Sequence, residues 1–90
     1  MTQVTRTVRV GSAHGLHARP AKLFVQAVKD AGIPVTISKG ASAPVDASSI
    51  LGVIALGIEH GDYVTLTADA ARAADVIDAL TENLTTDHDA

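Results

Sequence analysis

The stretch "GSAHGLHARPAKLF", residues 11–24, separates two patterns of apolar residues that together decide the fold class. Residues 3–10, which precede it, alternate between apolar and polar side chains, with Val4, Val8 and Val10 on one face. Such alternation predicts a half-buried strand. After the stretch, the apolar residues recur at helical spacing instead. The chain is therefore expected to leave a strand, turn, and enter a helix.

The predicted first helix begins inside the quoted stretch. Pro20 would break the interior of a helix but is tolerated in its first turn, so the helix should begin close to Ala18 or Arg19. Gly32 is expected to stop it. The residues that follow helical spacing in between are Leu23, Phe24, Ala27, Val28 and Ala31.

The rest of the chain predicts three more strands and two more helices. Strands are expected at residues 33–40, 43–47 and 63–68. A short helix at 48–57 should be capped by Ser48 or Ser49. Asp69 should cap a last helix, whose buried stripe is Ala73, Val76, Ile77, Leu80 and Leu84. Arg6 and Pro44 favour edge positions for the first and third strands. The order β-α-β-β-α-β-α predicts an α+β open-faced sandwich with its helices gathered on one face.

Composition bounds the classes of protein that this chain can represent. Ninety residues, 47% of them hydrophobic and none of them cysteine, predict a single domain over residues 1–90 held by packing alone. The net charge of −3 and the scarcity of aromatic residues argue against a nucleic-acid partner. No signal peptide is evident, and the apolar run at 50–58 is too short to cross a bilayer, so no membrane insertion is expected. The absence of cysteine suits a cytoplasmic protein, and we expect a monomer. Residues 85–90 should form a frayed polar tail.

The arrangement around His17 suggests chemistry with an anion. A helix that starts directly after His17 leaves its first backbone N–H groups unpaired, and these groups with the helix dipole form an anion site. Arg19 adds a planar cation suited to phosphate oxygens, and Gly15 allows close backbone approach. The surrounding positive charge favours the neutral imidazole of His17, which is a nucleophile. The alternative is that His17 is a solvated polar residue near a helix start.

The motif "GLHARPA" resembles the active-site signature of HPr, the histidine-containing phosphocarrier family of the bacterial phosphoenolpyruvate-dependent sugar phosphotransferase system (PTS). The likeness continues through "LFVQAVKDAG" and through "SSILGVIALGIEHGDYVTLTA", which is similar to the second signature of the family. It covers nearly the whole chain apart from the acidic tail. The resemblance implies four antiparallel strands covered on one face by three helices, as the pattern also predicts.

The resemblance assigns roles at the first motif. His17 matches the histidine that accepts a phosphoryl group on Nδ1 from phosphorylated enzyme I and passes it to an enzyme IIA domain for sugar uptake. Arg19 matches the arginine that attends the phosphate, and the backbone N–H groups of Ala18 and Arg19 match those that hold its oxygens. The implied protein is a stoichiometric carrier and not an enzyme, and it needs no cofactor.

Ser49 has two interpretations that do not exclude each other. It matches the serine that a dedicated kinase phosphorylates in some bacteria, with a kinase or phosphorylase as a further partner, and it is also a simple helix N-cap. Ser48 stands where many relatives carry a basic residue, which weakens the regulatory interpretation. The alternative function that this site would support is a regulatory binding module controlled by phosphorylation of Ser49.

The short second helix is apolar almost all round, so some of its surface should remain exposed and meet a partner. We expect Ile50, Leu51 and Ile54 to contact partners, in agreement with the docking face that the resemblance implies. Lys22 and Lys29 on the first helix could add the positive charge that acidic partners need.

A metal site is not expected. His14 and His17 are three residues apart, but Gly15 intervenes before the helix, and no cysteine or third ligand is evident. His14 is therefore given no chemical role. A plain structural or metal-binding domain remains a third alternative.

Overall fold

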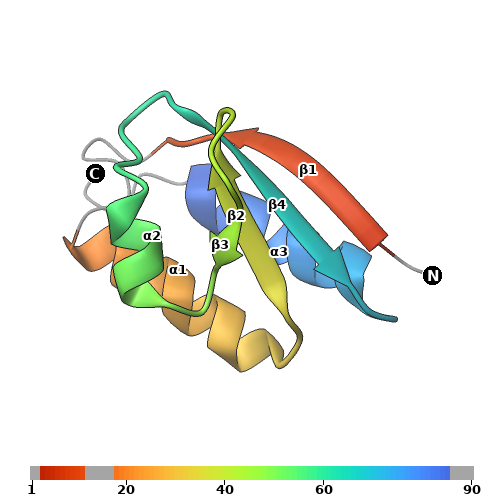
Figure 1. Cartoon of the computed structure of the whole chain (residues 1–90). Coiled ribbons are helices and arrows are strands. Elements are labelled where there is room, and N and C mark those ends of the chain that lie inside the picture. The colour runs from red at the N-terminus through yellow and green to blue at the C-terminus, as the bar shows by residue number, and fades with distance from the viewer. Residues whose placement is uncertain (1–2, 12–17, 86–90) are drawn as a thin grey trace.

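A computed structural model describes residues 3–11 and 18–85 of the chain, with the side chains of α1 described from Pro20 onward (Figure 1). The elements are β1 (Gln3–Arg9), α1 (Ala18–Ala31), β2 (Val35–Lys39), β3 (Val45–Asp46), α2 (Ile50–Ala55), β4 (Tyr63–Asp69) and α3 (Ala73–Thr85). This order and the start of α1 at Ala18 confirm the sequence prediction.

The four strands form one antiparallel sheet in the order β1-β4-β2-β3. Alternate residues of β4 point to opposite faces: Val64, Leu66 and Ala68 are buried, whereas Tyr63 is exposed. The outer face is rich in hydroxyl groups, with Thr5 opposite Thr67 in the β1–β4 ladder. One face of the sheet is therefore covered and the other is open.

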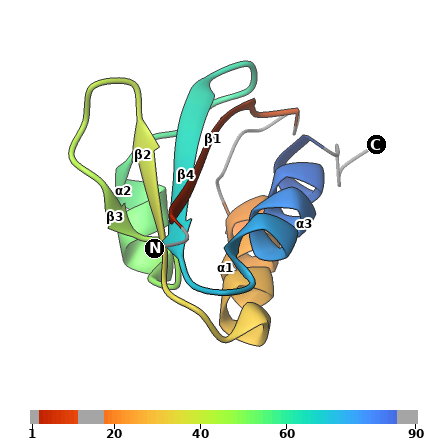
Figure 2. The same ribbon diagram turned by 90° about the vertical axis from the view of Figure 1, so that its right-hand side faces the viewer.

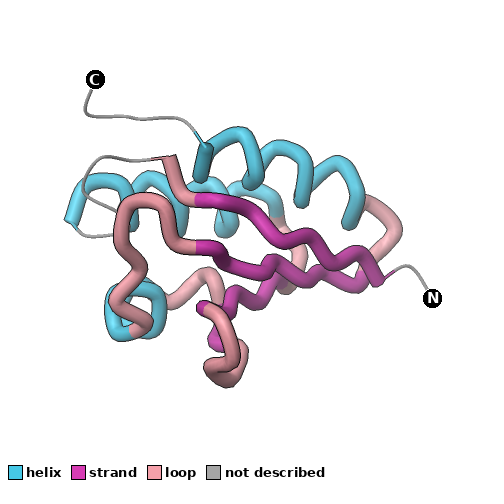
Figure 3. Tube along the Cα trace, turned by 90° about the horizontal axis from the view of Figure 1, so that it is seen from above, coloured by secondary structure: helices cyan, strands magenta, loops and turns pink. Residues whose placement is uncertain are grey.

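The helices bury their apolar side chains against the covered face. Figure 2 shows α1 and α3 side by side on one side of the sheet. Figure 3 shows the short α2 at the end of the molecule where β1 ends and α1 begins. All three helices share one core with the strands, and its largest fully buried side chains are Phe24, Ile37, Ile58, Leu66, Ile77, Leu80 and Leu84. The predicted α+β open-faced sandwich is confirmed.

Both edge positions predicted from single residues are also confirmed. β1 and β3 are the outer strands of the sheet. Arg6 lies on β1 with its side chain 41% exposed, and its guanidinium donates a hydrogen bond to Asp78 of α3. Pro44 directly precedes β3, where its missing N–H breaks no ladder hydrogen bond.

Several predicted boundaries were too generous. β2 begins at Val35 and not at residue 33, because Pro34 cannot donate to a ladder. β3 ends at Asp46, whose side chain and main chain both accept hydrogen bonds from the turn that follows. α2 spans Ile50–Ala55, inside the predicted range of 48–57.

The prediction that Asp69 caps the last helix was wrong. Asp69 is the final residue of β4, where it pairs with Gln3 of β1. The chain then makes a turn in which the N–H of Ala73 donates to the carbonyl of Ala70, and α3 starts at Ala73. Pairing with a full-length β1 keeps Asp69 in the sheet, and this long-range contact overrides its local capping preference.

Candidate functional site

The predicted site begins at the N-terminus of α1. His17 lies outside the described residues, and α1 starts at the next residue, Ala18, followed by Arg19. The backbone N–H groups of Ala18 and Arg19 belong to the first turn, where α-helix geometry supplies no intrahelical acceptor. The first turn of α1 contains no acidic residue that would oppose an anion. Pro20 is buried in this turn, and the fixed φ of proline matches the φ of a helix.

The end of β1 is fixed by the turn that precedes β4. The N–H of Val10 donates to the carbonyl of Asp62 at 2.9 Å, and the N–H of Gly61 donates to the carbonyl of Val10, also at 2.9 Å. We call these two hydrogen bonds, which join Val10 to Gly61 and Asp62, the closed backbone pair. They set the position from which the chain enters residues 12–17.

A second anchor holds the next residue against α3. The N–H of Gly11 donates to the carbonyl of Leu84 at 2.9 Å. A Cβ atom on Gly11 would lie 2.2 Å from the carbonyl oxygen of Thr85, so only glycine fits there. Thr85, which the sequence placed in the tail, is thus the last residue of α3, and residues 86–90 lie outside the described part of the chain.

The structure identifies Ser49 as the N-cap of α2. Its Oγ accepts a hydrogen bond from the N–H of Gly52 at 3.2 Å, and its backbone is extended. This confirms the capping role and selects Ser49 over Ser48. Ser48 instead donates both its N–H and its Oγ hydrogen to Asp46. Both hydrogen bonds lower the pKa of Asp46, the one from the N–H more than the one from the hydroxyl. A carboxylate therefore lies three residues before Ser49 in the chain.

Exposed apolar side chains gather on α2 and the neighbouring α1, and we call the following four residues the apolar patch. They are Leu23 of α1, 37% exposed, and Ile50, Leu51 and Ile54 of α2, at 37%, 79% and 40%. Their helices contact one another. The three α2 residues are exposed as the sequence predicted, whereas Leu23 was overlooked. Its position at the margin of the buried stripe of Ala21, Phe24, Val25 and Val28 is the signal that could have revealed it.

Basic side chains on α1 lie outside the core. Lys22 and Lys29 are both exposed, and Lys29 lies in the last turn of the helix. His14 lies outside the described residues, as does His17. Within residues 3–11 and 18–85, no group of three potential metal ligands comes together, and no helix is long and apolar enough to span a membrane.

The fold and this site define a class of protein: a small open-faced α+β sandwich in which a helix N-terminus and an exposed apolar helix share one end of the molecule. Comparison with known proteins gives the family. The family profile described as "PTS HPr component phosphorylation site" matches residues 4–86. The chain is 47% identical over 75 residues to the phosphocarrier protein HPr of Streptomyces coelicolor, covering 83% of this chain and 81% of that protein.

Two further similarities agree. The crystal structure of HPr from Bacillus anthracis superposes with a TM-score of 0.88 and 33% identity, covering 93% of this chain and 99% of that one. The multiphosphoryl transfer protein of Vibrio cholerae is 37% identical over an alignment of 78 residues, which covers 84% of this chain but only 20% of that longer protein. The chain belongs to the HPr family of PTS phosphocarrier proteins.

Proposed function

We propose that this chain accepts a phosphoryl group from phosphorylated enzyme I on Nδ1 of His17 and passes it to enzyme IIA domains for sugar uptake. The observation that carries this proposal is the start of α1 at Ala18, directly after His17, in a chain of the HPr family. A helix N-terminus at that position offers backbone donors and positive potential to a phosphate bonded to His17.

Only the two imidazoles form or break bonds in the transfer. The lone pair of Nδ1 attacks phosphorus, the P–N bond to the donor histidine breaks, and its electron pair returns to the donor ring. In the second half of the cycle, the same exchange occurs with a histidine of the acceptor. Arg19 and the N–H groups of Ala18 and Arg19 balance the phosphoryl charge, so that catalysis rests on positioning and electrostatics.

The apolar patch is proposed as the docking surface for both partners. Donor and acceptor must reach the same imidazole, so one exposed surface beside it would serve each of them in turn. Leu51, which is 79% exposed, is its most accessible member. Lys22 would add attraction for acidic partners.

Further features of the protein belong to the same proposal. It acts as a monomeric, stoichiometric carrier in the cytoplasm, without enzymatic turnover and without a cofactor, and residues 1–90 form a single domain. Phosphorylation of Ser49 by a serine kinase, reversed by a phosphorylase, would place a dianion at the edge of the apolar patch and oppose docking.

The experiment uses labelled phosphoenolpyruvate, purified enzyme I and the intact chain. We expect label to enter the chain only when enzyme I is present, and to leave it when an enzyme IIA domain is added. Label that enters without enzyme I, or that no enzyme IIA domain can remove, would contradict the proposal. A strain that lacks its own carrier supplies the cellular test, since sugar uptake should return when the chain is expressed.

A further inference from the structure

The turn over residues 57–62, which connects α2 to β4, is held by several internal contacts. Gly57 follows α2 with a φ of +64°, and its N–H donates to the carbonyl of Ile54. The N–H of Glu59 donates to Asp62 Oδ2 at 2.8 Å, and the N–H of Asp62 donates back to the carbonyl of Glu59 at 3.0 Å. We call this segment the 57–62 turn.

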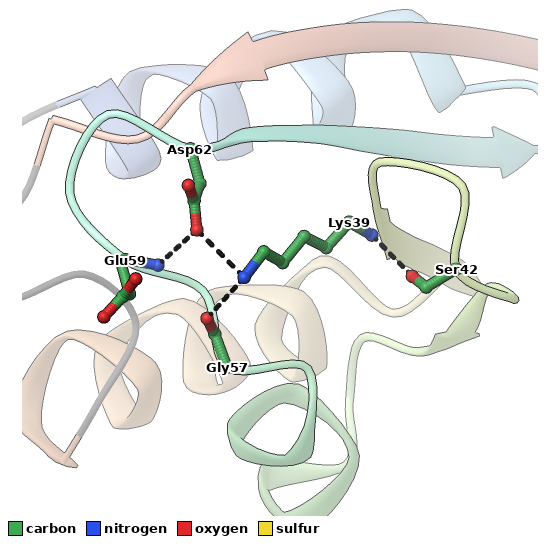
Figure 4. A network of polar contacts seen from close by, with 5 residues as sticks. All are labelled: Lys39, Ser42, Gly57, Glu59 and Asp62. Atoms are coloured by element: carbon green, nitrogen blue, oxygen red, sulfur yellow. Dashed lines mark hydrogen bonds and ion pairs between the residues drawn. The ribbon is translucent and has the colours of Figure 1, made fainter.

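Lys39, at the end of β2, joins the 57–62 turn to the sheet. Its Nζ donates to the carbonyl of Gly57 at 2.8 Å and lies 3.1 Å from Asp62 Oδ2, as Figure 4 shows. The side chains of Lys39 and Asp62 are only 35% and 30% exposed. The main chain of Lys39 is itself held, because its N–H donates to Ser42 Oγ at 3.0 Å. The ammonium group thus ties two points of the turn to a fixed point on the sheet.

The contact of Lys39 with the Gly57 carbonyl lies at the C-terminal end of α2 and can stabilise this helix. The helix has six residues, so it gains little stability from its own hydrogen bonds and depends on the packing of Val53 and on contacts at its ends. Ser49 holds the N-terminal end, and the Gly57 carbonyl lies just beyond the C-terminal end. A cation at a helix C-terminus also interacts favourably with the helix dipole.

The same turn holds the end of β1. Gly61 and Asp62 form the closed backbone pair with Val10, the residue before the segment that leads to His17. The 57–62 turn therefore connects α2, which carries most of the apolar patch, with the strand from which the histidine segment departs. Lys39 and Asp62 are the side chains that lock this connection.

We propose that Lys39 and Asp62 form a positioning pair that fixes the apolar patch relative to the end of β1. The pair acts through the 57–62 turn and does not contact the phosphoryl group. The inference rests on the proposed function for its kinetic consequence, whereas its structural consequence can be measured independently.

The structural test is amide hydrogen exchange of a Lys39→Met variant, which keeps the length of the side chain but removes its charge and donors. We expect the amides of Gly57, Val10 and Gly61 to exchange about tenfold faster than in the parent chain. The amide of Gly11 is the internal control, since it is bonded to Leu84 and should be unchanged. Arg72→Met, at an exposed position in the turn before α3, is the matched control for loss of a surface cation. Unchanged exchange at all three amides, or an equal acceleration at Gly11, would overturn the proposal.

The kinetic test measures phosphoryl transfer from phosphorylated enzyme I. Lys39→Met should raise the KM for this protein about threefold to tenfold and leave kcat within about twofold, because docking is altered and the chemistry is not. Lys39→Arg, which retains a cation and donors, should restore most of the loss. A fall in kcat as large as the rise in KM, or the same rise in KM in Arg72→Met, would overturn the positioning role.

Asp62→Asn provides a second variant should Lys39→Met fail to fold. The amide oxygen can still accept from the N–H of Glu59, so the turn keeps its internal contact and loses only its ion pair. The same pattern of exchange and KM is expected, and its absence would overturn the pair. If the parent chain takes no phosphoryl group from enzyme I, the proposed function fails, while the exchange measurements still decide whether the pair positions α2.

Discussion

The side chain of Ser49 accepts a single hydrogen bond, yet that bond marks where α2 begins. Serine is a preferred N-cap because its short side chain reaches the N–H groups that the first helical turn leaves unpaired. In this protein the Ser49 Oγ accepts from the N–H of Gly52, at the start of a helix too short to be stable alone. Ser49 therefore has a capping role in the unmodified protein.

Replacement of Ser49 by alanine should therefore destabilise the fold by about 1 kcal/mol, the usual cost of a lost N-cap. Ser49→Asp is the matched control, because aspartate is an equally good cap and should keep the stability of the parent. Urea unfolding monitored by circular dichroism measures both. An equal loss of unfolding free energy in the two variants would contradict the capping role, because aspartate retains a capping oxygen.

Asp62 predicts a dependence of stability on acid. The hydrogen bond from the N–H of Glu59, and secondarily that from Lys39, lower the pKa of Asp62 in the folded protein. A lowered folded pKa means that its stabilising contribution is present above the unfolded value of about 3.9 and is lost as the pH falls through the folded value.

The difference in unfolding free energy between the parent and Asp62→Asn should therefore be constant near neutral pH and shrink below about pH 4. Urea unfolding at a series of pH values measures this difference. A difference that stays constant down to the acid limit would mean that the ionisation of Asp62 does not contribute.

At the scale of elements, α2 has one buried face and one exposed face. Val53 is fully buried and fixes the helix to the core, and Ile58 just beyond the helix is buried as well. Leu51 lies 79% exposed. The sequence predicted an apolar helix with more apolar surface than a thin sandwich can cover, and the structure identifies which residues remain uncovered.

Leu51→Ala and Ile58→Ala should separate docking from folding. Removal of an exposed side chain should change stability by less than about 0.5 kcal/mol, whereas truncation of the buried isoleucine should cost about 2–5 kcal/mol. In transfer from enzyme I, Leu51→Ala should raise KM although it folds normally. A normal KM in a well-folded Leu51→Ala would remove this residue from the docking surface.

The order and type of all seven elements followed from periodicity, proline and glycine, whereas the errors at Asp69 and Leu23 arose where tertiary contacts decide. Asp69 has a good local preference for a cap, but pairing with β1 extends β4 through it. Leu23 fits helical spacing, but its exposure depends on where α2 and the sheet lie. Neither contact is visible in the local sequence.

At the scale of the whole molecule, contacts between distant segments hold the end of β1. Gly11 packs directly on the last residue of α3, and Val10 pairs with the 57–62 turn. The motif around His17 could be recognised from the sequence, as could the N-terminus of α1. The Lys39–Asp62 contact could not, because it joins the end of β2 to the 57–62 turn, and only the complete sheet determines how these two segments approach.

Two glycine substitutions should have opposite effects. Gly11→Ala places a methyl group against the rigid backbone of Thr85 and should destabilise the fold by about 1–3 kcal/mol. Gly52→Ala meets its nearest atom at 3.4 Å within a helix and should stabilise the protein by about 0.5–1 kcal/mol. Thermal unfolding of both variants provides the measurement. A stable Gly11→Ala would show that the end of α3 can move away from β1.

The most direct test of the central claim is the phosphorylation of histidine variants by phosphoenolpyruvate and enzyme I. The parent chain and His14→Ala should both acquire an acid-labile phosphoryl group, because His14 has no proposed role in the transfer. His17→Ala should acquire none while keeping its fold by circular dichroism. Labelling of a folded His17→Ala to the level of the parent would contradict the assignment of His17 as the phosphoryl carrier.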